Sequence, residues 1–399
     1  MKSERNIILL ITAVQLINLI DFMMVFPLGP FFAADLGIPT NLVGVVAAGY
    51  SAAAVVGGLF GALFLDRYGR RIVLAICLLG LVIGTALGGF ATGLYTLVGA
   101  RIIAGLFGGP ATSVALAIIA DAIPPERRGN AMGKVMGAFA IASVGGVPAS
   151  LFLAGHFGWQ APFFALSAFG LLIVLGVITL LPPMRTQLEE VSAKSEPNKV
   201  QKPLFTRPIV WISMIAVGSN MGAAFAIVPN FATYFVFNLE YPELRISLLY
   251  LLGGIVSFVM MRVAGKLTDQ RSASFTAWAG TGLMVLALVP LIHAPLLFSI
   301  EVVFMCFMGA MSLRNVSVRT LTSKVPMPNE RARFMSGISV AQHVASTLGA
   351  LASAQILIGT ADGSLEGFSI LVIAVLGCMI VLPMLMSYID NSVRNKARV

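Results

Sequence analysis

The side chains most able to do chemistry in this sequence are ionisable groups inside long apolar segments. Asp21 lies in the apolar segment 7–30, Arg101 in the segment 95–120 and Glu301 in the segment 296–322. Placing such a group in an apolar medium costs at least ~2.5–3.5 kcal/mol, so it usually faces a cavity or a partner of opposite charge. These three residues are therefore the first candidates for proton coupling.

Asp21 and Arg101 are expected to lie at the same depth. Asp21 follows about 14 residues of helix, or ~21 Å, and Arg101 lies about 6 residues, or ~9 Å, from the opposite face. The two depths nearly coincide in a hydrocarbon core ~30 Å thick. The functional hypothesis is that Asp21 binds and releases a proton while Arg101 favours its ionised form. The alternatives are a fixed structural ion pair and an Asp at a helix irregularity before Pro27.

The segment 296–322 carries a second polar pattern. Glu301, Asn315 and Arg319 share one helical stripe with two methionines and a serine, because all are spaced by three or four residues. Arg314 points away from this stripe and is a separate candidate for the substrate cavity. The alternative is that Glu301 lies near the external interface and Arg319 reaches inward to the cytoplasmic one, which leaves only Asn315 functional.

Further candidates for a substrate cavity are neutral amides, large apolar side chains and one histidine. They are Gln15, Asn18, Phe22, Met24, Asn220, Phe225, Asn230 and His343. Amides inside membrane helices often serve only as interhelical hydrogen bonds, and the apolar side chains could equally pack or face lipid. His343 could titrate near neutral pH or be a hydrogen-bonded structural residue.

Composition identifies the medium that surrounds these residues. Apolar residues make up 58% of the 399 and charged residues only 11%, which is far from a soluble domain. Each crossing needs about 20 apolar residues. We expect an all-α integral membrane protein with twelve transmembrane helices, near 7–30, 42–64, 72–93, 95–120, 131–155, 160–181, 208–237, 246–268, 275–293, 296–322, 335–358 and 367–389.

Basic residues predict the orientation of these helices. With the N-terminus inside, 21 of the 26 Lys and Arg residues fall on the cytoplasmic side, as short cytoplasmic loops require. Both termini are therefore expected in the cytoplasm of a bacterial cell, with the helices in its inner membrane. These basic residues lack the interleaved aromatics of a nucleic-acid site. The three cysteines form no metal or disulfide pattern, so we expect no bound metal.

The two halves of the chain repeat each other. The loop 265–269 echoes 62–66, and 329–331 echoes 125–127, at offsets of 203 to 204 residues. The expected domains are an N-terminal six-helix bundle (1–184), a cytoplasmic linker (185–207) and a C-terminal six-helix bundle (208–399). Parallel repeats imply a pseudo-two-fold axis along the membrane normal and a central cavity, which is a transport path.

The loop Asp66-Arg67-Tyr68-Gly69-Arg70-Arg71 resembles the signature loop of the major facilitator superfamily, with Ala62 in place of that family's leading glycine. Leu19-Ile20-Asp21, Arg101 with two glycines after it, and the loop 124–129 resemble the twelve-span drug:proton antiporters and sugar-efflux permeases. The span-5 signature departs from the antiporters at Val147. The resemblance implies that the loops latch the two halves together, with gating residues Asp66, Arg67, Gly69, Arg70, Asp121, Arg127 and Asp269.

These observations predict a secondary active transporter that exports a small amphipathic or apolar molecule by proton-coupled alternating access. A uniporter or proton symporter of a sugar or other metabolite is the alternative. No phosphate-binding loop is present, so the proton gradient is the expected energy source and no cofactor is needed. A membrane-embedded receptor or enzyme is disfavoured, because no soluble domain or catalytic cluster is recognisable. The expected partners are the substrate, protons and the lipid bilayer, and we expect a monomer.

Overall fold

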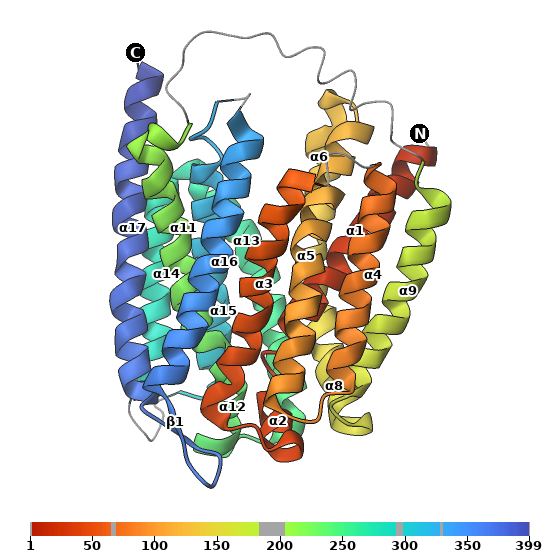
Figure 1. Cartoon of the computed structure of the whole chain (residues 1–399). Coiled ribbons are helices and arrows are strands. Elements are labelled where there is room, and N and C mark those ends of the chain that lie inside the picture. The colour runs from red at the N-terminus through yellow and green to blue at the C-terminus, as the bar shows by residue number, and fades with distance from the viewer. Residues whose placement is uncertain (1, 65–68, 183–203, 293–297, 328–329, 399) are drawn as a thin grey trace. The chain divides into compact units, whose positions relative to one another are not determined.

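The computed structural model describes residues 2–64, 69–182, 204–292, 298–327 and 330–398, and its architecture is helical (Figure 1). The chain divides into two compact units. Unit 1 comprises Met1–Ile38 and Gly49–Val200, and unit 2 comprises Pro39–Ala48 and Gln201–Val399. Unit 2 thus includes residues 39–48, which form the turn before the second span and the first residues of that span. The rest of the second span belongs to unit 1.

Unit 1 is built from the first six spans. Its helices are α1 (Lys2–Met24), α2 (Gly29–Leu36), α3 (Val43–Phe64, preceded by the 3₁₀ turn η1, Thr40–Leu42), α4 (Arg70–Gly89), α5 (Leu94–Ala122), α6 (Pro125–Met136), α7 (Ala138–Ile141), the π-helix η3 (Ala142–Gly146), α8 (Val147–Phe157) and α9 (Ala161–Leu180). Helix α4 packs against α5 and α9, and α1 packs against α5 and α9. These neighbours bring the first, third and fourth spans together around the positions of Asp21 and Arg101.

The first span differs from the expected continuous helix over residues 7–30. Helix α1 ends at Met24, a turn follows, and α2 begins at Gly29 with Pro30 in its first turn. Pro27 lies in this turn, where a residue without a backbone N–H cannot continue the helix. Asp21 therefore sits one turn before the break, as one of the alternative interpretations expected.

The fifth span is also irregular. Helices α6 and α7 lead into the π-helix η3, and α8 follows with Pro148 in its first turn. A π-helical turn places an extra residue in the ladder, and such turns are frequent at functional sites. Gly146, which ends this turn, allows a close approach, because a Cβ there would lie 2.4 Å from the Ile20 side chain of α1.

Unit 2 is built from the last six spans. Its elements are η4 (Leu204–Thr206), α11 (Pro208–Ile227), η5 (Val228–Asn230), α12 (Phe231–Thr233), the π-helix η6 (Tyr234–Asn238), η7 (Glu243–Arg245), α13 (Ile246–Gln270), α14 (Ala273–Leu288), η8 (Val289–Ile292), α15 (Ile300–Thr322), α16 (Arg331–Ile356), β1 (Ile358–Gly359), β2 (Leu365–Glu366) and α17 (Phe368–Arg398). Helix α11 packs against α16 and α17, α13 against α15, and α14 against α15 and α17.

Two features of unit 2 were not expected from the sequence. The seventh span breaks into 3₁₀, α and π turns after Ile227, where Pro229 interrupts the α-helical ladder. The strands β1 and β2 form a short antiparallel hairpin between α16 and α17, with Ile358 paired to Glu366. This hairpin lies in a connecting segment, so the membrane-spanning architecture remains helical.

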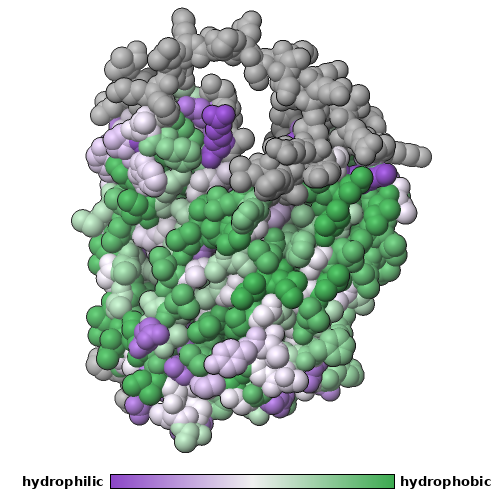
Figure 2. Space-filling view, in the orientation of Figure 1, coloured by the Kyte–Doolittle hydropathy of each residue, from purple (hydrophilic) through white to green (hydrophobic). Residues whose placement is uncertain are grey.

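Eleven helices in the described residues are long and apolar enough to cross a membrane. The remaining predicted span, 335–358, corresponds to α16, which has 26 residues and a polar composition that includes Gln342 and His343. Large apolar side chains are exposed on the outer faces of the spans, among them Ile76, Leu172 and Ile370. Hydrophobic surface covers much of the visible helical faces in Figure 2, as contact with lipid requires.

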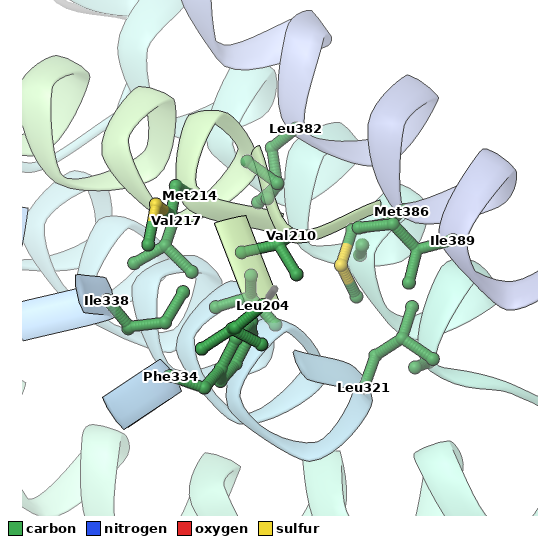
Figure 3. Close-up of a cluster of buried hydrophobic side chains, with 14 residues drawn as sticks. Leu204, Val210, Met214, Val217, Leu321, Phe334, Ile338, Leu382, Met386 and Ile389 are labelled. Carbon is green, nitrogen blue, oxygen red and sulfur yellow. The ribbon is translucent and has the colours of Figure 1, made fainter. Parts of the chain in front are cut away.

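A cluster of buried apolar side chains holds unit 2 together near the N-terminal end of α11 (Figure 3). It combines side chains from η4, α11, α14, α15, α16 and α17, which include Leu204, Val210, Leu321, Phe334 and Ile389. Phe334 and Ile389 are fully buried. This packing fixes five helices of unit 2 to one another at that end.

Candidate functional site

Unit 1 contains a buried ion pair between the first and fourth spans. Arg101 of α5 donates from Nη1 to Oδ1 of Asp21 and from Nη2 to Oδ2, each at 2.8 Å. Nη2 also donates to the backbone carbonyl of Asp21 at 3.0 Å. The exposed fraction is 1% for the Arg101 side chain and zero for that of Asp21. The contact that helix depth predicted is therefore present, in a bidentate form.

Three neutral side chains complete this site. The hydroxyl of Thr85, on α4, donates to Asp21 Oδ1 at 2.7 Å. The ring of Tyr50, on α3, lies 4.8 Å from the Arg101 guanidinium carbon, a cation–π distance. The Tyr50 hydroxyl donates to Asn18 Oδ1 at 2.6 Å, and Asn18 donates in turn to Gly108 O and to Thr112 of α5. The Asp21 carboxylate thus accepts three hydrogen bonds, two from Arg101 and one from Thr85. The Arg101 guanidinium has the Tyr50 ring as an electron-rich neighbour in addition to Asp21.

Close backbone packing places Tyr50 beside Arg101. A Cβ on Gly105 would lie 2.2 Å from the backbone oxygen of Tyr50, and one on Gly109 would lie 2.7 Å from that of Ala54. Only glycine allows α3 and α5 to approach this closely. The Gly105-x-x-x-Gly109 pattern therefore serves the site directly, because it sets the distance between the tyrosine and arginine helices.

Unit 2 contains a second buried arginine, Arg314 of α15. Its Nε donates to Asn220 Oδ1 of α11 at 3.0 Å, and its Nη1 donates to Thr281 Oγ1 of α14 at 2.5 Å and to the Met379 carbonyl of α17 at 3.0 Å. Asn220 Nδ2 donates to Asn315 Oδ1 at 2.7 Å. The exposed fraction of Arg314 is zero, and its Nη2 has no hydrogen-bond partner among the described residues.

Glu301 and Arg319, the ends of the predicted polar stripe, lie apart from this network. Glu301 occupies the first turn of α15 and accepts a hydrogen bond from Tyr241 at 3.0 Å. Burial and the hydrogen bond to Glu301 raise the pKa of Tyr241 to about 12. Arg319 is exposed near the other end of the helix. The geometry therefore favours the alternative in which Asn315 is the functional member of the stripe.

The remaining candidates for the cavity are mostly packed between helices. Gln15, Met24, Phe225 and Asn230 are buried, and Gln15 donates to the Thr112 carbonyl while Asn230 donates to Ser353. Phe22 and His343 are half-buried, and the ring of Phe22 lies 5.1 Å from that of Tyr50. Among these side chains, Phe22 thus lies nearest to the ion-pair site by contact, while a role in substrate binding stays a prediction for each.

Of the seven predicted gating residues, Asp66 and Arg67 lie outside the described residues. Arg70 Nε donates to Asp121 Oδ2 at 2.7 Å, so two of the predicted gating residues are in contact. Arg127 pairs with Glu4 of α1 at 3.0 Å. Gly69 is the residue before α4, and Asp269 is exposed in the last turn of α13.

Sequence reasoning missed the hydroxyl groups of both networks. Tyr50, Thr85 and Thr281 each bind a buried charged or amide side chain. Their signal was weak, because serine and threonine in a membrane helix usually bond to the carbonyl one turn back, as Thr85 also does with Leu81. Only the three-dimensional neighbours distinguish a hydroxyl that serves a site from one that serves its own helix.

A chain of many membrane-spanning helices in two units, with a buried ion pair inside one of them, defines a multi-pass membrane carrier. Residues 11–350 match the model of the Major Facilitator Superfamily. The chain therefore belongs to that superfamily, whose members are transporters and not enzymes and need no cofactor. It is a secondary transporter.

Curated relatives include a resistance protein and two transport proteins. The chain is 28% identical over 277 residues to the chloramphenicol resistance protein of Streptomyces lividans, covering 69% of this chain and 70% of that one. It is 30% identical over 198 residues to the sialic acid transporter NanX of Escherichia coli, covering 49% and 47%. It is 23% identical over 274 residues to the inner membrane transport protein YdhP of E. coli, covering 68% of each.

Solved structures share the fold at low identity. A bacterial homolog of the lysosomal transporter Spinster, in an inward-facing and occupied conformation, superposes with a TM-score of 0.74 at 14% identity over 96% of each chain. A D-xylose-proton symporter superposes with a TM-score of 0.72 at 18% identity, again over 96% of each. These likenesses establish the fold of this chain.

Proposed function

We propose that this chain exports a small amphipathic or apolar molecule, a drug or a metabolite, in exchange for protons by alternating access. Asp21 is the proton acceptor in this proposal, and Arg101 is its counter-ion. The observation that carries it is the bidentate pair between these side chains, buried inside unit 1 and completed by Thr85. A titratable group that is fully buried and faces a cation is the arrangement a proton carrier needs.

In this proposal, one proton changes the hydrogen bonds of the site. In the ionised form, Asp21 occupies two guanidinium N–H groups of Arg101 and the Thr85 hydroxyl. Protonation turns one carboxylate oxygen of Asp21 into an O–H donor. That oxygen no longer accepts a hydrogen bond from the guanidinium group as it did before. Arg101 then keeps the Tyr50 ring and the Asp21 backbone carbonyl as neighbours. Proton binding therefore loosens the contact between α1 and α5, which is a coupling of charge to helix packing.

Transport in proteoliposomes with an imposed pH gradient tests this proposal. Chloramphenicol is the first probe, because a relative is named for resistance to it. Substrate should move against its gradient while an entrapped pH-sensitive dye reports proton movement in the opposite direction. Asp21→Asn should abolish both movements, since the amide neither binds nor releases a proton.

The exposed Asp35 of α2 offers a matched control. Asp35→Asn removes the same charge from a side chain with no place in the ion-pair site, and it should transport like the wild type. Unchanged proton-driven transport in Asp21→Asn would remove Asp21 from the mechanism. Transport that is driven by the substrate gradient alone, in both variants, would contradict proton coupling altogether.

Proton symport or uniport of a sugar or another metabolite is a second candidate function. It is favoured by the similarity to a sialic acid transporter at 30% identity, although that match covers only 49% of this chain. The same proteoliposomes, loaded with sialic acid as the probe, distinguish the candidates. Symport moves substrate and protons in one direction, exchange moves them in opposite directions, and uniport leaves the dye unchanged.

The proposal extends to the domains and the gate. Residues 1–184 and 208–399 are proposed to move as two bundles joined by the linker 185–207, with both termini in the cytoplasm. The loop that contains Asp66, Arg67 and Gly69 is proposed to act with Arg70, Asp121, Arg127 and Asp269 as an inner gate. The Arg70–Asp121 ion pair supports this part of the proposal, because it joins the first residue of α4 to the end of α5.

A further inference from the structure

The two units contain corresponding arginine networks that differ in one charge. In unit 1, an arginine of the fourth span binds an acid of the first span, Asp21, and the acid also accepts from a threonine of the third span. In unit 2, Arg314 of the corresponding fourth helix binds Asn220 of the first helix and Thr281 of the third. An amide in unit 2 thus replaces the carboxylate of unit 1.

Arg314 is therefore a buried positive charge without a buried negative one. Its exposed fraction is zero, and no salt bridge in the described part of the chain includes it. Its Nη2 lacks even a neutral hydrogen-bond partner there. An uncompensated buried guanidinium is strongly destabilising, so the site favours any anion that approaches it.

Two asparagines, Asn220 and Asn315, connect the buried Arg314 charge to a less buried position by hydrogen bonds. Arginine only donates, so Asn220 must present its Oδ1 to Arg314 Nε and its Nδ2 to Asn315. Asn315 must then accept with Oδ1, which leaves its own Nδ2 as the terminal donor of the chain. Asn315 is half-buried, whereas Asn220 is fully buried. Aligned donors polarise one another, so the terminal N–H group is a strengthened donor on a side chain that is only half-buried.

We propose that Arg314, Asn220 and Asn315 form an anion-recognition subsite, in which the Asn315 amide binds a carboxylate or similar anionic group of the transported molecule. The buried Arg314 charge stabilises that anion through the two amides. This inference rests on the proposed transport function and adds amphipathic molecules with an anionic head to its candidate substrates. Asp21 of unit 1 remains the proton site, and the anion site is confined to unit 2.

Binding to the purified protein, without any pH gradient, tests the subsite. The probes are benzoate, naphthoate and octanoate, each compared with its own uncharged amide of the same shape, by ligand-induced shift of the melting temperature. Wild-type protein should prefer the carboxylate by about tenfold in at least one pair, because one hydrogen bond to a charged group supports a difference of that size.

Asn220→Asp is the decisive variant. It places a carboxylate against Arg314, so the charge is neutralised internally and the Asn315 amide must turn its nitrogen inward. The variant should melt at a higher temperature than the wild type without ligand and should lose the carboxylate preference. Asn238→Asp is the matched control, because Asn238 binds Leu365 and has no contact with Arg314. It should keep the preference.

Asn315→Ala provides a second variant, which removes the terminal donor from a half-buried position and should lose the preference even if Asn220→Asp does not fold. Equal binding of carboxylates and amides in all three pairs overturns the proposal, as does a preference that survives in Asn315→Ala. Because no proton gradient is present, this result is independent of Asp21. An Asp21→Asn variant that still couples protons to transport and retains the carboxylate preference would disprove the proposed role of Asp21 and leave the anion site in place.

Discussion

Asp21 and Arg101 form a bidentate ion pair whose two hydrogen bonds are each 2.8 Å long and whose side chains are essentially without exposed surface. Such a pair joins helices α1 and α5 by charge as well as by packing. Because neither group reaches water, each depends on the other for its compensation. The energetic value of this pair is therefore best measured by removing its members singly and together.

Arg101→Leu should destabilise the protein by about 3–5 kcal/mol, because it leaves the Asp21 carboxylate buried without a cation. The double variant Asp21→Leu/Arg101→Leu should lose less, since apolar side chains can replace a buried pair at small cost. The measurement is unfolding of the purified protein in detergent, compared across the wild type, both single variants and the double variant. A double variant that loses the sum of the two single losses would mean that the side chains do not depend on each other.

Gly105→Ala should destabilise the contact between α3 and α5, because its Cβ would lie 2.2 Å from the backbone oxygen of Tyr50. The expected loss is about 1–3 kcal/mol, the usual cost of overpacking, with a parallel loss of proton-coupled transport as Tyr50 shifts. Melting temperature and transport in proteoliposomes check the two effects.

Gly99→Ala is the control on the same helix. A Cβ at Gly99 meets nothing within 4 Å, so alanine should only improve helix propensity there. Equal melting temperatures for Gly105→Ala and Gly99→Ala would show that the close approach of α3 and α5 carries no strain.

Tyr241→Phe should remove part of the loss of stability at alkaline pH. The pKa of Tyr241 is raised to about 12 by burial and by its hydrogen bond to Glu301. A raised folded-state pKa means that the neutral phenol contributes stability below pH ~10, its unfolded value, and that this contribution is lost as pH rises towards 12. Melting temperatures between pH 9 and 12 should therefore fall less steeply for the Phe variant.

Tyr388, which is exposed in α17, is the control for the loss of a phenol group. Tyr388→Phe should follow the wild type at every pH, because the Tyr388 side chain is 55% exposed and takes part in no hydrogen bond to Glu301. An identical pH slope for Tyr241→Phe and the wild type would contradict a stabilising hydrogen bond between Tyr241 and Glu301.

The sequence predicted the helices and the Asp21–Arg101 contact well, because hydrophobic run length and helical rise are simple to count. It gave the irregularity before Pro27 only as an alternative and did not predict the other helix breaks. The interruptions at Pro27 and Pro229 and the π-turn before Pro148 depend on how each freed carbonyl finds a partner in the fold. It placed Arg314 and Arg319 on different faces of their helix but could not show which of them is buried, since only the folded unit shows that Arg314 is buried against Asn220 while Arg319 is exposed.

The Arg70–Asp121 pair yields the last prediction, which concerns the proposed gate. Its side chains are 21% and 29% exposed, so the pair contributes at most about 1 kcal/mol to stability. Asp121→Asn should therefore leave the melting temperature almost unchanged. If the pair latches the gate, the same variant should slow turnover several-fold at unchanged substrate affinity, which paired binding and transport measurements in proteoliposomes can separate.

Glu4→Gln tests the other described ion pair of the proposed gate, because it breaks the pair between Glu4 and Arg127, whose side chains are 27% and 55% exposed. A gate that depends mainly on Arg70 and Asp121 predicts slow turnover in Asp121→Asn and a smaller effect in Glu4→Gln. Equal slowing in both variants would mean that the gate depends as much on the Glu4–Arg127 pair. Wild-type turnover in Asp121→Asn would mean that the arginines of the loop have no role in gating. Their positive charge would then serve only to orient the helices in the membrane.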